Sequence, residues 1–83
     1  MATIDEVKTV LVDTLQLGPR SASIEAATSL LGSIPELDSM AVVNVITAIE
    51  EHFGIVVADD EISADTFETL ASLSAFVEQK LAA

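Results

Sequence analysis

The chain has 83 residues, of which 51% are hydrophobic, no cysteine, and a formal net charge of -11 from fourteen acidic and three basic residues. This length predicts one domain over residues 1–83, and the lack of cysteine excludes disulfides and thiolate metal sites. The negative charge argues against nucleic acids and anionic membranes as partners and favours proteins with basic patches.

The ends of the chain carry no recognisable targeting signal. Residues Met1 to Glu6 show neither the basic region nor the apolar core of a signal peptide, and no lipidation motif is evident. The most apolar stretch, Met40 to Ile49, is about ten residues long, against the roughly twenty that span a bilayer. We therefore expect a cytoplasmic protein, and the acidic surface predicts a monomer.

The first helix is predicted over residues Thr3 to Leu17. Thr3 with Glu6 is a capping-box pattern, and Gly18-Pro19 interrupts the helix. Apolar residues recur at helical spacing between these signals: Ile4, Val7, Leu11 and Leu15. From Gly18 to Leu37 the composition predicts a long ordered loop with one helical turn at Ile24 to Ala27.

The second helix is predicted over Ser39 to Phe53. Asp38 is a plausible N-cap, and Gly54 stands where a left-handed C-terminal cap is expected. At about 100° per residue the core face comprises Val42, Ile46, Ile49 and Phe53, with Val45 at its edge. The outward face comprises Met40, Asn44, Thr47 and Glu51.

The last third of the chain predicts a connector and two further helices. Ile55 to Val57 is expected to be extended, and Asp59-Asp60-Glu61 then begins a short third helix. Thr69 caps a final helix with Lys80 in its last turn. The apolar face of that helix is Leu70, Leu73, Phe76, Val77 and Leu81. These elements predict an all-α fold, a small four-helix bundle with a long loop between helices one and two and a short third helix.

The side chains offer few means of catalysis. The chain has one histidine and no cysteine or tyrosine, and His52 would lie about 20 Å from Ser39 along the second helix. Ser39 also lacks the G-x-S-x-G turn of serine hydrolases. Four acidic residues between positions 59 and 65 lack the spacing of a calcium loop. We interpret His52 as a surface residue and expect a non-catalytic protein without a metal site.

Ser39 is the candidate functional residue. It places a hydroxyl in the first turn of the second helix, beside an outward Met40, in an acidic chain that has no thiol of its own. These features suit a covalent attachment point. Asp-Ser at a helix start is also an ordinary capping pair, so the residues alone leave a purely structural role open.

Three segments in register resemble an acyl carrier protein, and the resemblance spans essentially the whole chain. They are Glu36-Leu37-Asp38-Ser39-Met40, the stretch from Ala48 to Ile55, and Phe67-Glu68-Thr69-Leu70. The D-S-L motif of the family stands here as Asp38-Ser39-Met40, a conservative departure. The E-E-x-F-G-I pattern stands as Glu50 to Ile55.

The resemblance implies that a phosphopantetheinyl transferase attaches 4'-phosphopantetheine from coenzyme A to the Ser39 hydroxyl. The thiol of that arm would carry acyl groups as thioesters. A phosphate there would meet the unpaired N–H groups of a helix N-terminus, although the charge of Asp38 opposes it. The resemblance also implies shelter for the acyl chain, with the candidate lining residues Val42, Ile46, Ile62, Phe67 and Leu70.

The outer face of the second helix departs from the family's fatty-acid carriers, which usually place acidic residues there. This chain has neutral Ala41, Asn44 and Thr47, and acidic residues return only further along. Expected contacts with the transferase, acyl-loading ligases or transferases, and synthases are Met40, Val43, Thr47, Glu50 and Glu51. The departure predicts less charge-steered recognition and a specialised acyl, lipid or polyketide pathway rather than housekeeping fatty acid biosynthesis.

Two other interpretations remain open. The chain could be an unmodified acidic helical adaptor that uses the second helix only as a protein-binding face. It could also be a peptidyl or aryl carrier of a nonribosomal pathway, which shares the arm and its chemistry and differs in its cargo.

Overall fold

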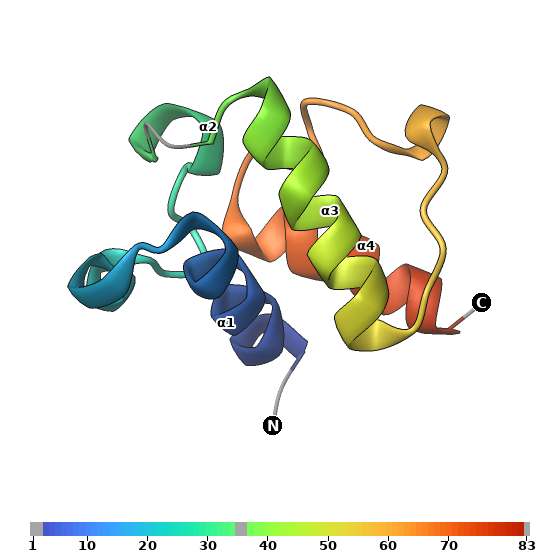
Figure 1. Cartoon of the computed structure of the whole chain (residues 1–83), viewed down its shortest axis with the longest axis horizontal. Coiled ribbons are helices and arrows are strands. Elements are labelled where there is room, and N and C mark those ends of the chain that lie inside the picture. Colours follow the sequence, from blue (N-terminus) through green and yellow to red (C-terminus); the bar gives the residue numbers. More distant parts are fainter. Residues whose placement is uncertain (1–2, 35–36, 83) are drawn as a thin grey trace.

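The fold consists of three long helices and short helical turns between them (Figure 1). The computed structural model describes residues 3–34 and 37–82. In these ranges the elements are α1 (Thr3–Leu15), the 3-10 helix η1 (Gly18–Ser23), α2 (Leu30–Ser33), α3 (Ser39–Phe53), the 3-10 helix η2 (Asp59–Glu61) and α4 (Leu70–Ala82). The described residues form no strand and contain no helix with the length and apolar character needed to cross a membrane. The all-α prediction is confirmed, but the expected short third helix is only the turn η2.

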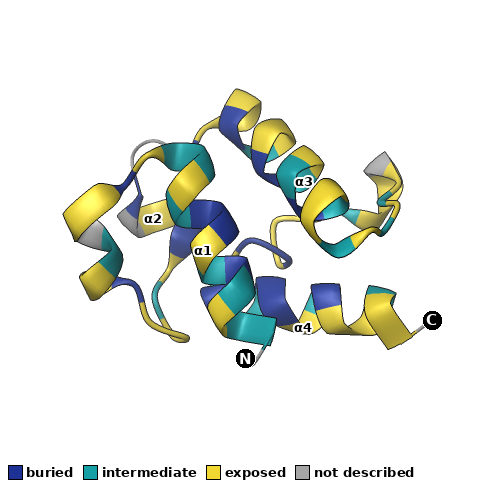
Figure 2. Ribbon diagram, turned by 60° about the horizontal axis from the view of Figure 1, so that its bottom comes forward, coloured by how far each residue is buried: buried dark blue, intermediate teal, exposed yellow. Residues whose placement is uncertain are grey.

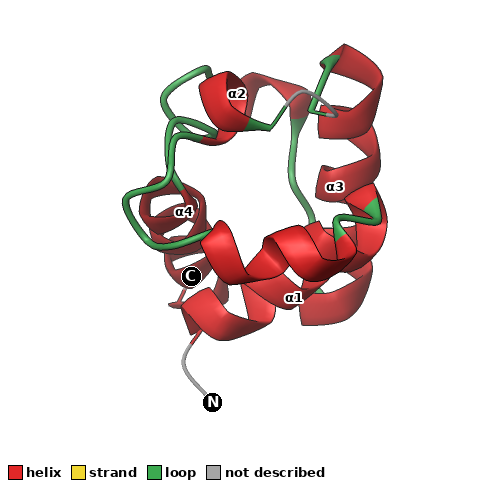
Figure 3. Cartoon of the chain, turned by 90° about the vertical axis from the view of Figure 1, so that its left-hand side faces the viewer, coloured by secondary structure: helices red, strands yellow, loops and turns green. Residues whose placement is uncertain are grey.

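Helix α1 is the centre of the packing, because it contacts both α3 and α4 (Figure 3). Each long helix turns an apolar face inward, and its remaining residues are half-buried or exposed (Figure 2). The long helices contribute Val7, Val10, Leu11, Ala41, Val45, Ile49, Leu70, Leu73 and Val77 to the buried core. The segments between them contribute Leu17, Ile24, Leu30, Ile34, Leu37 and Phe67.

Helix α1 ends two residues earlier than the spacing predicts. Gln16 adopts the left-handed conformation, with φ of 54°, and the Leu17 amide donates a hydrogen bond of 3.0 Å to the Val12 carbonyl. This backbone pattern closes a helix and directs the next apolar side chain back toward it. Leu17 is accordingly buried outside the helix rather than inside it.

The long segment from Gly18 to Leu37 is more structured than predicted. Helical turns form at Gly18–Ser23 and Leu30–Ser33, whereas the expected turn at Ile24 to Ala27 is a non-helical turn closed by the Thr28 amide and the Glu25 carbonyl. Two backbone hydrogen bonds fix the segment to the start of α4, from Leu30 to Glu68 (3.0 Å) and from Ala71 to Ala26 (2.9 Å). Another part of the chain thus satisfies backbone polar groups at residues 26 and 30 of this segment.

Helix α3 begins and ends where predicted. The Asp38 carboxylate accepts a hydrogen bond of 2.8 Å from the Ala41 amide, and Gly54 adopts φ of 68° at the C-terminal cap. Its inward face is rotated from the prediction, because Val45 is fully buried at its centre and Ala41 is buried beside it. Three residues assigned to the core face are only half-buried: Val42, Ile46 and Phe53.

The connector after α3 contains neither helix nor strand at Ile55 to Val57, and the Glu50 carboxylate accepts a hydrogen bond of 2.8 Å from the Val57 amide. The predicted cap of α4 is also confirmed, since the Thr69 hydroxyl accepts a hydrogen bond of 3.0 Å from the Ser72 amide. Leu81 was expected in the core but is exposed, because the last turn of α4 is largely open to solvent (Figure 2).

The rotation of α3 predicts opposite results for two valines on that helix. Val45→Ala should lower the free energy of unfolding by about 2 kcal/mol, because it removes methyl groups from a fully buried site. Val43→Ala should change it by less than about 0.5 kcal/mol, because the Val43 side chain is 57% exposed. Urea unfolding followed by circular dichroism measures both, and equal losses would contradict this orientation of α3.

The cap of α3 predicts a second pair of results. Asp38→Ala should lower the free energy of unfolding by about 1 kcal/mol, because it leaves the Ala41 amide without its acceptor. Asp38→Ser retains a capping oxygen and removes the charge, so it should retain most of the stability. Thermal unfolding of the two variants separates the hydrogen bond from the charge, and an equally large loss in Asp38→Ser would assign the effect to the charge.

Candidate functional site

Ser39 is the first residue of α3, and its side chain is exposed. Asp38 holds the start of the helix through two hydrogen bonds, one from the Ala41 amide to its carboxylate and one of 2.9 Å from the Val42 amide to its carbonyl. These bonds fix the helical turn that carries Ser39 without involving the Ser39 hydroxyl. Asp38 therefore caps α3, and the Ser39 hydroxyl beside it remains accessible, as the sequence predicts.

The local electrostatics suit a phosphate ester at this hydroxyl. The N-terminus of a helix carries the positive end of its dipole and presents N–H groups that attract anions. The Ser39 and Met40 amides have no hydrogen-bond partner among the described residues, so they remain available to an anion. The adjacent Asp38 carboxylate opposes a second negative charge. Glu36, which also belongs to the motif, lies outside the described residues.

The outer surface of α3 next to Ser39 is neutral and partly apolar. Met40 and Val43 are 71% and 57% exposed, and no charged residue occurs between Met40 and Ile49. Asn44 and Thr47 are exposed as expected, but Ala41 is buried and does not belong to this face. We call the exposed set Met40, Val43, Asn44 and Thr47 the neutral stripe.

The two glutamates at the end of the neutral stripe differ. Glu51 is exposed, whereas Glu50 is half-buried and one of its carboxylate oxygens accepts the Val57 amide. Glu50 therefore links α3 to the connector that follows it. This role requires a contact seven residues further along the chain, and no motif in the sequence indicates it.

A mostly apolar cleft of about 290 Å³ opens beside α3, one helical turn after Ser39. Its lining residues are Val42, Ile62, Ser63, Ala64 and Phe67. Three of the five predicted lining residues are therefore brought together: Val42, Ile62 and Phe67. Ile46 and Leu70 do not line the cleft, and Leu70 is buried in the core instead. Ser63 and Ala64 were missed, because nothing in their residue types distinguishes them from ordinary loop residues.

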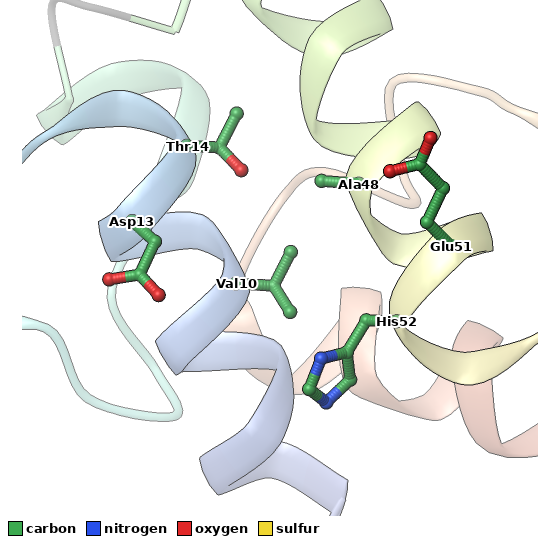
Figure 4. Close-up of a pocket in the computed structure, with 6 residues that line it drawn as sticks. All are labelled: Val10, Asp13, Thr14, Ala48, Glu51 and His52. Carbon is green, nitrogen blue, oxygen red and sulfur yellow. The ribbon is translucent and has the colours of Figure 1, made fainter.

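A second, more polar hollow lies between α1 and α3 (Figure 4). Its lining residues are Val10, Asp13, Thr14, Ala48, Glu51 and His52. The His52 ring reaches toward α1, where its Nε2 atom lies 3.4 Å from Glu6 Oε1, and it packs edge-on against Phe53. His52 is exposed, in agreement with its interpretation as a surface residue.

These groups do not converge on a catalytic arrangement. Ser39 and His52 stand at opposite ends of α3, about 20 Å apart by helical rise, so His52 cannot activate the Ser39 hydroxyl. In the described ranges, no group of three or more His, Asp or Glu side chains could hold a metal ion. The site offers an accessible hydroxyl, a helix N-terminus, a neutral stripe and an apolar cleft.

Comparison with known proteins gives two findings. The family model for the phosphopantetheine attachment site matches residues 5–77. The chain is also similar to the solution structure of a holo acyl carrier protein from Nitrosomonas europaea, with 59% sequence identity, a TM-score of 0.91 and full coverage of both chains. On both grounds the chain belongs to the acyl carrier proteins, which are carriers rather than catalysts and hold 4'-phosphopantetheine as a covalent prosthetic group.

Proposed function

We propose that Ser39 bears the 4'-phosphopantetheine arm and that the protein carries acyl groups as thioesters for a specialised acyl, lipid or polyketide pathway. The observation that carries this proposal is the exposed Ser39 hydroxyl at the start of α3, one turn from an apolar cleft. The arm supplies the thiol that this cysteine-free chain lacks.

The chain's own part in the modification is limited to presenting a nucleophile. The Ser39 oxygen forms a bond to the phosphorus of coenzyme A that bears the pantetheine, the hydroxyl proton passes to a base of the transferase, and adenosine 3',5'-bisphosphate leaves. The first turn of α3 orients the hydroxyl outward, and the Ser39 and Met40 amides, which have no hydrogen-bond partner among the described residues, favour the phosphodiester anion that results. Magnesium and the base belong to the transferase.

The neutral stripe supports the proposal of a specialised pathway. A partner that docks on Met40 and Val43 gains from apolar contact, whereas the next acidic side chains along α3 are Glu50 and Glu51. Such a surface favours partners with an apolar patch near the serine and a basic group further along. We propose that the transferase, the loading enzyme and the synthase all contact this stripe.

The attachment site is tested by intact mass after incubation with coenzyme A, magnesium and a broad-specificity phosphopantetheinyl transferase. The parent protein should gain one phosphopantetheine group and Ser39→Ala none. Ser29→Ala is the matched control, because Ser29 is an exposed serine that also precedes a helix, and it should be modified like the parent. No mass gain in the folded parent, with the transferase active on another carrier, would favour the unmodified adaptor.

The docking stripe is tested by the kinetics of the same modification. Met40→Ala and Val43→Ala should each raise the KM for the carrier roughly three- to tenfold with little change in kcat, because they truncate contacts outside the reacting group. Val56→Ala is the control, since Val56 is 80% exposed but lies in the connector beyond α3. A KM that rises steeply with ionic strength and is insensitive to Met40 would contradict apolar docking.

A further inference from the structure

One wall of the apolar cleft is formed by a segment with little secondary structure. Three of the five lining residues, Ile62, Ser63 and Ala64, lie in the connector between α3 and α4, directly after η2. Ile62 is half-buried and the other two are exposed. The position of this wall therefore depends on how the connector is held rather than on deep burial of its side chains.

Both ends of this part of the connector are tied to a long helix. On one side the Val57 amide donates to the Glu50 carboxylate of α3. On the other side the Ser72 hydroxyl of α4 donates a hydrogen bond of 3.0 Å to the Thr66 carbonyl. The wall residues lie between these two ties.

An ion pair joins the middle of the connector to a helix. Lys80 Nζ, in the last turn of α4, donates to both carboxylate oxygens of Glu61 at 2.9 and 2.7 Å. The Ala58 amide donates to the same carboxylate at 2.9 Å. The backbone hydrogen bonds of this stretch and the contacts between Ser63 and Thr66 join the connector to itself.

The ion pair is only partly buried. The Lys80 and Glu61 side chains are 24% and 35% exposed, so the pair is partly shielded from solvent but still open to screening by salt. The hydrogen bond from Lys80, followed by that from Ala58, lowers the pKa of the Glu61 carboxyl below its ordinary value of 4.5. Glu61 is therefore ionised and paired at neutral pH.

We infer that Lys80 and Glu61 are positioning residues that clamp Ile62 and the following two residues against the cleft, and so set how well the cleft shelters an acyl chain. The inference about shelter rests on the proposed carrier function. The inference about the clamp rests only on the protein's own contacts. When the pair opens, the wall can move while the α1-centred core remains packed.

The clamp is tested first on the unmodified protein by amide hydrogen exchange. Lys80→Gln and Glu61→Gln should each speed exchange of the Thr66 and Phe67 amides roughly two- to fivefold, with no change at the Leu11 amide of α1. Lys80→Arg should restore slow exchange, because a guanidinium also pairs with a carboxylate through two bonds. Lys8→Gln removes the same charge elsewhere and should leave these amides unchanged.

Shelter is tested on the loaded protein. Cleavage of the thioester by hydroxylamine should be roughly two- to fivefold faster in Lys80→Gln than in the parent when the cargo is octanoyl. The rate should be unchanged when the cargo is acetyl, because that group is too short to lie in the cleft. Lys80→Arg should return the octanoyl rate to that of the parent.

Different results would contradict the clamp and the role in shelter. Unchanged exchange at Thr66 and Phe67, or an equal increase at Leu11, would overturn the clamp. A thioester rate that is the same for octanoyl in the parent and in Lys80→Gln, or that rises equally for acetyl, would overturn the role in shelter. Failure of the proposed function would appear instead as the absence of any mass gain in the parent.

Discussion

The structure depends on the packing of both α3 and α4 against α1. The α1 residues Val7, Val10 and Leu11 are buried, and α1 is the only long helix in the described chain that packs extensively against both of the others. Helices α3 and α4 both pack on α1 and make little contact with each other along their length. The space beside them has to be filled by the connecting segments.

This constraint explains why the connections are ordered. A chain of this size has little apolar surface to spare, so Leu17, Ile24 and Phe67 have to be buried even though they lie outside the long helices. The backbone bonds from Leu30 to Glu68 and from Ala71 to Ala26 bring the first long loop against the start of α4. The connecting segments do not fill the space beside Val42 completely, and the apolar cleft remains there.

The sequence predicts the features that depend on neighbouring residues. The caps at Asp38, Gly54 and Thr69 were predicted because each uses a backbone group within a few positions of its side chain. The inward face of α3 was not, since apolar residues occur on several sides of this helix and its packing against α1 selects Val45. The short third helix fails for a related reason, because acidic residues permit a helix start but do not provide an apolar face to bury.

The candidate site also contains some residues that the sequence predicts and some contacts that it does not. Asp38 and Ser39 belong to a local motif and could be found from the sequence, as could Val42, Ile62 and Phe67 from the resemblance. The bonds from Val57 to Glu50 and from Lys80 to Glu61 join distant positions, so no spacing rule reveals them.

Charge is distributed unevenly between the connector and the exposed face of α3. The chain has only three basic side chains against fourteen acidic ones, and self-repulsion of such a surface works against compact packing. One of the three, Lys80, pairs with Glu61 in an acidic part of the connector, whereas the neutral stripe of α3 carries no charge at all. The cleft wall is thus held by an ion pair at the surface and the core by apolar burial around α1. The two are not independent, because Ile62 and Phe67 also pack with the core. Ser63 and Ala64 are exposed, and we propose that this part of the wall yields to a cargo while the packing that keeps Ser39 at the start of α3 is retained.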